Sequence, residues 1–471
     1  MIKRARNLAL RSPLPPLTLL GLIFAYAVFW HGAVLPETWD QILLALAILG
    51  GIYPLMAPSA ERAPALPRWL RTVLVLLPGY VVFQLLPLPV SWLRMLSPAK
   101  ARLYEALGPV ALATGSWEPL AVRPAITLLY LLRIVGYLIT FLIARQLVHR
   151  FCERPWMSVL PIVIVATAEA LLGVFQTTRL ESADAFAIGT YVNRNHFAGM
   201  LEMAFPFAVM RVISLLRTTG PESWSRLVPV ARIGAYLMAS GLILLGIFSS
   251  LSRAGVVAAV FSLTLIASAE PVPMLGQRYR GFPGWSPGWL PGIAVALLLV
   301  AGFAAISPSR LMSRFTELAT PEIAGMDRRA IWSQTLRVVA DYTLTGCGLG
   351  GYRATYLRYK TEMPLWTTDF AHNDYLQLLA ELGGAGFLIV AAGLMGVLYM
   401  AIRGWSAVSS AEARSLSVAC TAALGAILIH SLVDFNLYIP ANAMEVAWIA
   451  GVAVALPETR QNKTDAPFFP N

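Results

Sequence analysis

Residues 371–403 read AHNDYLQLLAELGGAGFLIVAAGLMGVLYMAIR, and this stretch decides the fold. It is polar as far as Gly383-Gly384, whereas residues 386–403 form an apolar run close to the roughly 20 residues that a helix needs to cross a bilayer. Comparable runs occur at 16–34, 40–57, 70–88, 125–145, 156–176, 196–214, 230–249, 252–270, 288–306, 414–434 and 438–456. The sequence therefore predicts an all-α polytopic membrane protein with about 12 transmembrane helices.

The composition supports this class. The chain of 471 residues is 57% hydrophobic and 13% charged, whereas soluble domains carry about 25% charged residues. The formal net charge of +11 favours basic cytoplasmic loops and an anionic ligand over nucleic acid. The cysteines Cys152, Cys347 and Cys420 show neither a disulfide framework nor metal-ligand spacing.

The distribution of Lys and Arg predicts the orientation. The basic segment Met1–Pro13 runs into an apolar stretch without a clear cleavage site, so we expect a retained first helix. With the N-terminus in the cytoplasm, the short outer loops are nearly free of Lys and Arg. The inner segments then hold Arg62, Arg68, Arg71, Arg145, Arg150, Arg154, Arg211, Arg217, Arg226, Arg232, Arg278, Arg280, Arg403, Arg414, Arg460 and Lys463. We expect both termini to be cytoplasmic.

This topology divides the chain into four parts. Residues 1–306 hold spans one to nine, together with an outer segment at 88–124 whose pattern predicts an amphipathic surface helix. Residues 307–385 form one long outer loop, residues 386–456 the last three spans, and residues 457–471 a cytoplasmic tail.

The long outer loop shows two helical patterns. One begins at Arg328 and is expected to end near Tyr342; the other begins near His372 and is closed by Gly383-Gly384. Between them lies the glycine-rich stretch 346–351. It has neither the preceding strand nor the lysine of a phosphate-binding loop, so we interpret it as a helix stop that needs unusual backbone angles.

His372 is the main candidate for chemistry in this loop. It lies at a predicted helix start, with Asn373 and Asp374 as candidate caps, and free N–H groups there favour anions. Histidine titrates near neutral pH, which suits a general base that activates a hydroxyl group. An exposed loop histidine is more often an ordinary surface residue, so spacing alone leaves both interpretations open.

Other polar residues interrupt the apolar runs near the same outer surface. Arg253 follows Ser250 and Ser252 between two spans, where it either contacts an anion or extends to the interface. Glu202 lies inside a span, and we expect Arg133 as its partner. Further candidates are Asn193, Arg194, Asn195, His196, His430, Asp434 and Asn436.

These candidates favour one kind of substrate. Arginines at 194, 253, 328 and 329 are suited to neutralise a departing pyrophosphate, and His372 to activate an acceptor hydroxyl. The loop lacks an evident carboxylate cluster, so a metal-dependent phosphate site is not expected.

Four stretches follow one another along the chain from Tyr191 onward. They are Tyr191–Ala198 (YVNRNHFA), Ser252–Gly255 (SRAG), Arg328–Trp332 (RRAIW) with Leu344–Gly348 (LTGCG), and Ala371–Leu376 (AHNDYL) with Glu381–Gly383. His430–Phe435 (HSLVDF) follows them. In order and placement, these motifs resemble the O-antigen ligase and polymerase superfamily of bacterial membrane glycosyltransferases.

The resemblance implies a GT-C-like fold with one long periplasmic loop in the bacterial inner membrane. It implies metal-independent, cofactor-free transfer of a glycan from undecaprenyl pyrophosphate to an acceptor hydroxyl. By this resemblance the family's essential histidine matches His372, its membrane-edge arginine matches Arg253, and its loop arginine matches Arg328, with Arg329 adjacent. Substrate contacts are expected from Arg329, Asn193, Arg194, Asn195, Asp374 and Asp434.

The resemblance leaves the acceptor open. Ligases of this superfamily act on lipid A core, polymerases join repeat units, and related enzymes glycosylate protein. We favour the ligase. A transporter or flippase stays a further alternative, because polar residues in a bundle also line permeation paths.

Overall fold

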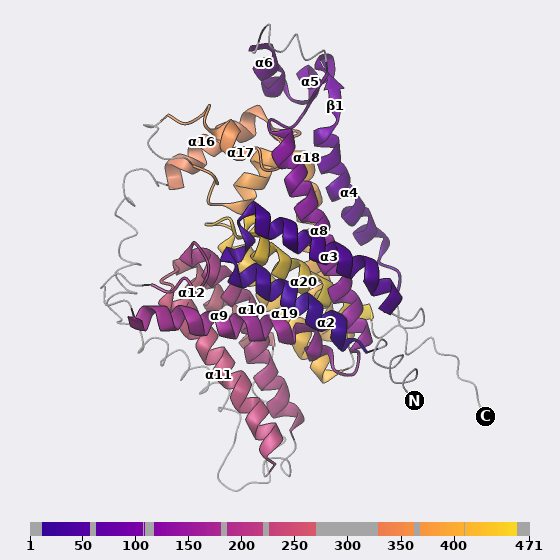
Figure 1. The fold of residues 1–471 in the computed structure, drawn as a ribbon, viewed down its shortest axis with the longest axis vertical. Helices are drawn as coiled ribbons and strands as arrows, with labels where there is room; N and C mark the ends of the chain where they lie inside the picture. The colour runs from indigo at the N-terminus through magenta and orange to yellow at the C-terminus, as the bar shows by residue number, and fades with distance from the viewer. Residues whose placement is uncertain are drawn as a thin grey trace, which may run out of the picture.

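The structure is a computed structural model, and it describes residues 12–56, 63–106 with Gly108, 117–179, 186–219, 226–269, 328–361, 368–408 and 410–458. Within these ranges the regular structure is helical apart from one two-stranded sheet. Figure 1 shows a bundle of long helices, with the shorter helices α16, α17, α5 and α6 gathered toward one end.

Seven helical segments among the described residues are long and apolar enough to cross a membrane. They are α8 (Pro124–Arg150), η3 (Pro155–Val159) with α9 (Leu160–Arg179), α10 (Arg194–Thr218), α11 (Leu227–Ser249), α18 (Asp374–Ala407), α19 (Ala411–His430) and α20 (Pro440–Glu458). The shorter apolar helices are α2 (Leu14–Phe29) and α12 (Arg253–Ala269), and α3 (Pro36–Met56) and α4 (Arg68–Leu85) join them. The protein is therefore a multi-pass membrane protein.

The predicted apolar runs correspond closely to these helices. Each run within the described residues forms a helix. The run at 288–306 lies outside the described residues, as do the segment before Ser12 and the tail after Glu458. The all-α polytopic fold is thus confirmed, and the count of twelve stays a prediction.

Helices α10, α19 and α20 form the centre of the bundle, where most of their residues are buried. Small side chains allow the close packing of these helices, as is usual inside membranes. Gly451 of α20 shows this most clearly, because a Cβ atom there would collide with the Phe141 carbonyl oxygen of α8. The central bundle thus fixes the positions of the helix ends that carry the site.

The segment expected to form one amphipathic helix at 88–124 is built differently. It contains α5 (Val90–Leu96), α6 (Pro98–Ala106) and a two-stranded antiparallel sheet of β1 (Pro87–Pro89) and β2 (Trp117–Pro119). Proline at position 98 begins a new helix after Ser97. Leu93 is buried in a small core with Leu88 and Leu120, so its apolar side chain packs within the protein. The prediction of one helix was wrong here.

The loop helices are confirmed. Helix α16 (Arg328–Asp341) ends where expected, and the glycine-rich stretch follows with positive φ angles at Gly346, Gly348 and Gly350. The short helix α17 (Tyr352–Tyr356) then precedes α18. Within α18, Gly383 has φ 62° and ψ −176°, which are not helical values. The loop helix therefore ends at Gly383, and a second helical segment continues toward the other end of the bundle.

Candidate functional site

His372 lies immediately before the cap of α18. Asn373 caps this helix, because its side-chain oxygen accepts hydrogen bonds from the backbone N–H groups of Tyr375 and Leu376, both at 3.0 Å. His372 itself has φ +50°, a left-handed conformation that is costly for a residue with a Cβ atom. Strain of this kind concentrates at functional sites, where surrounding contacts hold it in place.

Two hydrogen bonds hold the residue before His372. The Ala371 carbonyl oxygen accepts from Trp332 Nε1 at 3.0 Å, and the Ala371 N–H donates to Gln377 Oε1 at 2.6 Å. Trp332 belongs to the first turns of α16, so this contact also fixes the N-terminal end of α16 beside His372. The position of the imidazole is thus set by both loop helices.

The imidazole of His372 faces a buried carboxylate. His372 Nδ1 lies 3.7 Å from Asp434 Oδ1, and His196 Nε2 lies 3.6 Å from the same oxygen. We call these three residues the His–Asp centre. The Phe435 ring contacts both imidazoles edge to face, with ring centroids 4.9 Å from His372 and 4.6 Å from His196. The His372 side chain is 20% exposed, whereas those of His196 and Asp434 are 6% and 1% exposed, so His372 is the member that a substrate can reach.

Asp434 carries the negative charge of the centre. Burial opposes ionisation, but the two imidazoles that face the carboxylate outweigh it and hold the Asp434 pKa well below its usual range. A carboxylate beside Nδ1 orients the ring and stabilises the imidazolium form, which leaves Nε2 of His372 for a substrate. The arrangement is suited to general-base chemistry.

A second histidine–carboxylate pair lies deeper in the bundle. His430 Nδ1 and Glu202 Oε2 are 2.9 Å apart, and both side chains are fully buried. The expected partner of Glu202, Arg133, instead places its guanidinium group over the Tyr130 ring. The prediction of a Glu202–Arg133 pair was therefore wrong, because packing of α10 against α19 brings His430 to Glu202.

Asp374 and Asn193 have clear local roles. Asp374 is buried; one of its carboxylate oxygens accepts hydrogen bonds from Ser431 Oγ at 2.7 Å and Leu437 N–H at 3.2 Å. Its own N–H donates to the carbonyl oxygens of Ser431 and Asp434. Asn193 caps α10 by accepting from the Asn195 N–H at 2.8 Å. Asp374 thus fastens α18 to the segment that carries Asp434.

The four candidate arginines share one structural position, the first turn of a helix. Arg194 begins α10, Arg253 begins α12, and Arg328 and Arg329 begin α16. Free N–H groups and the helix dipole favour anions at such ends. A Cβ atom on Gly255 would lie 2.8 Å from Ala198 Cβ, so α12 and α10 start close together. This set of helix ends is suited to an anionic group.

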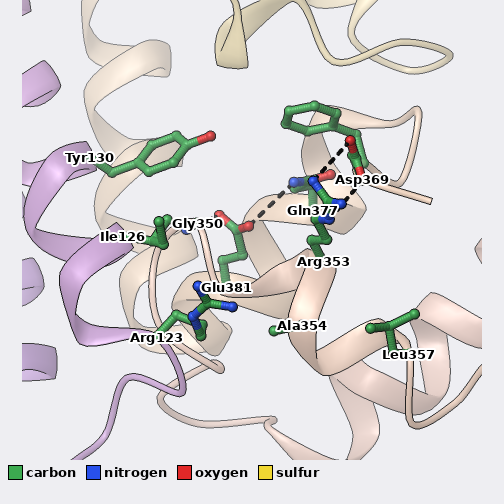
Figure 2. Close-up of a pocket in the computed structure, with 11 residues that line it drawn as sticks. Arg123, Ile126, Tyr130, Gly350, Arg353, Ala354, Leu357, Asp369, Gln377 and Glu381 are labelled. Carbon is green, nitrogen blue, oxygen red and sulfur yellow. Dashed lines mark hydrogen bonds and ion pairs between the residues drawn. The ribbon is translucent and has the colours of Figure 1, made fainter. Parts of the chain in front are cut away.

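A pocket of about 500 Å³ lies beside the segment that precedes α18, with Asp369 and Phe370 in its lining. It lies between the start of α8, helix α17 and the first part of α18 (Figure 2). Its lining consists of Arg123, Ile126, Tyr130, Gly350, Arg353, Ala354, Leu357, Asp369, Phe370, Gln377 and Glu381. None of the site residues expected from the sequence lines this pocket. No local pattern predicts this pocket, because its walls come from three separate segments of the chain.

The histidines gather in a way that their separation along the chain does not predict. His196 joins His372 at Asp434, and His430 pairs with Glu202. The available signal was their placement at the same end of two apolar runs. Among the described residues, no group of three or more His, Cys, Asp or Glu side chains is placed to hold a metal ion.

Comparison with known proteins finds a family similarity for the part of the chain that includes His372. A search of the curated proteins gives no match to this chain. The family model described as O-Antigen ligase matches residues 238–391, which include Arg253, Arg328 and His372. The match agrees with the resemblance of the motifs, so residues 238–391 of this multi-pass membrane protein are similar to the O-antigen ligase family.

Proposed function

We propose that the protein is a metal-independent, O-antigen ligase-like glycosyltransferase. It moves a glycan from undecaprenyl pyrophosphate to an acceptor hydroxyl at the periplasmic face of the bacterial inner membrane. The observation that supports this most directly is the His–Asp centre, where the accessible His372 faces the buried Asp434 at the start of a helix.

In the proposed reaction, His372 acts as the general base. Its Nε2 takes the proton of the acceptor hydroxyl while that oxygen forms a bond to the sugar carbon attached to pyrophosphate. The bond between this carbon and the pyrophosphate oxygen breaks, and its electron pair leaves with the pyrophosphate. Asp434 stabilises the imidazolium until the proton passes to solvent or to the released pyrophosphate.

The arginines would bind the leaving group. Arg194 and Arg253 begin two neighbouring helices, and Arg328 and Arg329 begin α16, whose Trp332 holds Ala371. Guanidinium groups contact phosphate oxygens through two parallel hydrogen bonds and stay charged at all working pH values. Charge that develops on the pyrophosphate would thus be stabilised without a metal ion.

The acceptor distinguishes the candidate functions. Lipid A core is the acceptor of the ligase that we favour, whereas another glycan would indicate a polymerase and a protein would indicate an oligosaccharyltransferase. Transport of a lipid-linked glycan is the less favoured alternative. The strained, accessible His372 supports chemistry at the surface over transport.

The test is transfer by purified protein in liposomes with an undecaprenyl-pyrophosphate-linked glycan and defined acceptors. His372→Asn is the sharpest variant, because asparagine tolerates the left-handed backbone and lacks a base. We expect transfer to fall by about 10²- to 10⁴-fold, the usual contribution of a general base.

The matched control is His31→Asn. His31 is exposed and also has a positive φ angle, at 59°, so it receives the same substitution in the same backbone conformation. It should keep full transfer. Normal transfer by His372→Asn would show that His372 is not the general base. If the unmodified protein transfers no glycan to any acceptor, the proposed glycosyltransferase activity is wrong.

A further inference from the structure

We propose that the pocket between α8, α17 and α18 binds the acceptor sugar beside the reacting hydroxyl, with Arg123 selecting a sugar that carries an anionic group. This inference rests on the proposed glycosyl transfer, and it assigns a role to Arg123 and Tyr130, which lie outside the quoted motifs.

The pocket and His372 belong to one connected structure. Phe370, which lines the pocket, stacks on Phe435 with ring centroids 4.1 Å apart, and Phe435 contacts the imidazole of His372. Gln377 also lines the pocket, and its side-chain oxygen accepts the N–H of Ala371 at 2.6 Å. Two aromatic side chains in contact, Phe370 and Phe435, therefore connect the pocket to the His372 imidazole.

The pocket wall is built around Glu381. Its Oε2 accepts from Gly350 N–H at 2.8 Å and from the Tyr438 hydroxyl at 2.8 Å, while Oε1 faces Tyr352 N–H at 3.2 Å and Gln377 Nε2 at 3.3 Å. Because these four donors satisfy the Glu381 carboxylate, it stabilises the pocket wall, and other groups are expected to bind the ligand.

The glycine-rich stretch 346–351 contributes Gly350 to the pocket wall. Gly350 has φ +77°, and a Cβ atom there would collide with the Tyr130 ring. Only glycine therefore lets Tyr130 lie against this turn, which places the ring on one wall of the pocket and Arg353, carried by α17, on another (Figure 2).

The lining is suited to a sugar ring. Aromatic rings such as Tyr130 and Phe370 offer an apolar face, and the Tyr130 hydroxyl adds a polar edge. Arg353 and Asp369 form an ion pair at 3.0 Å that presents donors and acceptors side by side, as neighbouring hydroxyl groups require. The volume lies within the ~300–1,000 Å³ of small-molecule sites.

Charge and position favour the acceptor over the donor. The arginines that begin α10, α12 and α16 are absent from the lining, so the pyrophosphate has its own candidate binding groups. In the pocket, Asp369 offsets Arg353, and Glu381 is occupied by neutral donors. Among the residues that the structure describes, no carboxylate forms an ion pair with Arg123, so its charge is available to an anionic substituent.

The experiment measures both Michaelis constants separately for Arg123→Gln and Tyr130→Phe, with lipopolysaccharide core as acceptor and a lipid-linked glycan as donor. Loss of one hydrogen bond to a charged group costs about ten- to hundredfold in affinity. We expect the acceptor KM of Arg123→Gln to rise by that factor while the donor KM is unchanged. Tyr130→Phe should give a smaller rise in acceptor KM. The control is Arg102→Gln, an exposed arginine of the same outer region that pairs with Asp341 and does not line the pocket.

Salt provides the second readout. Binding of free core oligosaccharide to the full-length protein, measured without donor, should weaken as NaCl rises to ~0.5 M, since salt screens exposed charges. The same titration of Arg123→Gln should be nearly flat. An unchanged acceptor KM in Arg123→Gln, or a raised donor KM instead, would overturn the inference while transfer by the unmodified protein leaves the proposed function intact.

Discussion

At the scale of single residues, the His–Asp centre combines a histidine with a positive φ angle, His372, and a buried carboxylate, Asp434. His372 adopts a conformation that costs a residue with a side chain about 1–3 kcal/mol. The hydrogen bonds to Ala371 and the cap at Asn373 fix the residues on either side of it. The imidazole is therefore positioned before a substrate arrives, which lowers the cost of orientation during the reaction.

Asp434 predicts a pH dependence of stability. Burial raises its pKa, the facing imidazoles lower it more, and the net pKa in the folded protein is well below the unfolded value of about 3.9. The ionised side chain thus stabilises the fold above that unfolded value, and the contribution is lost as pH falls through the folded pKa. We expect Asp434→Asn to lower the unfolding temperature at pH 7, and the difference from the parent to narrow below about pH 4.

Thermal unfolding in detergent between about pH 3 and pH 7 provides the measurement. The exposed Asp40→Asn is the control, and it should follow the parent at each pH. A difference that widens on acidification would contradict the assignment of a stabilising ionised Asp434.

The sequence predicts His372 and Asp434 as candidate residues, but it does not predict which side chains lie next to one another in the folded protein. His372 and Asp434 stood out because each interrupts or borders an apolar run. The pairing of His430 with Glu202 joins residues separated by 228 positions. Such a contact depends on how α10 and α19 pack, which no local pattern records. For the same reason Arg133 was the wrong partner for Glu202.

At the scale of elements, two glycines allow the loop helix to pack on the glycine-rich stretch. The Gly348 N–H donates to the Glu381 carbonyl oxygen at 3.0 Å, and the Gly384 N–H donates to that of Thr343 at 2.7 Å. A Cβ atom on Gly383 would collide with the Leu344 carbonyl group, and one on Gly346 with the Glu381 carbonyl group. Backbone lies directly on backbone here, so there is no room for a side chain.

This contact predicts that alanine lowers the stability of the fold at Gly383 but not at the neighbouring Gly384. Gly383→Ala places a Cβ atom against the Leu344 backbone and forces a left-handed residue, which costs about 1–3 kcal/mol for strain before the collision. We expect a marked fall in the unfolding temperature. Gly384→Ala is the control, because its nearest neighbour would be Thr343 O at an ordinary 3.5 Å. Equal unfolding temperatures for the two variants would contradict the backbone contact.

Hydropathy predicted the elements well where bilayer length governs them. The helices α8, α10 and α19 follow their apolar runs within a few residues. The prediction of one helix at 88–124 was wrong because prolines and a two-stranded sheet divide this segment. Its leucines also pack into a local core. An amphipathic pattern cannot distinguish an apolar face that meets lipid from one that meets protein.

At the scale of the whole molecule, the helix ends opposite the His–Asp centre indicate the orientation of the bundle. Those ends of α10, α18 and α19 carry Arg217, Arg403 and Arg414. Arg403 and Arg414 flank the short connection between α18 and α19, and basic residues beside short loops favour a cytoplasmic location. We expect a reporter fused after Pro271 to report the cytoplasm and one inserted near Thr361 to report the periplasm. The same compartment for both would contradict the predicted span at 288–306.

The separation of the pocket from the arginine-bearing helix ends has a stereochemical consequence. If the acceptor lies in the pocket and the pyrophosphate contacts the arginines at the starts of α10, α12 and α16, both substrates occupy the protein together. In a direct transfer between them, the incoming oxygen approaches the sugar from the face opposite the departing pyrophosphate. A single displacement of this kind inverts configuration at the transferred sugar, so an α-linked donor gives a β-linked product and the reverse.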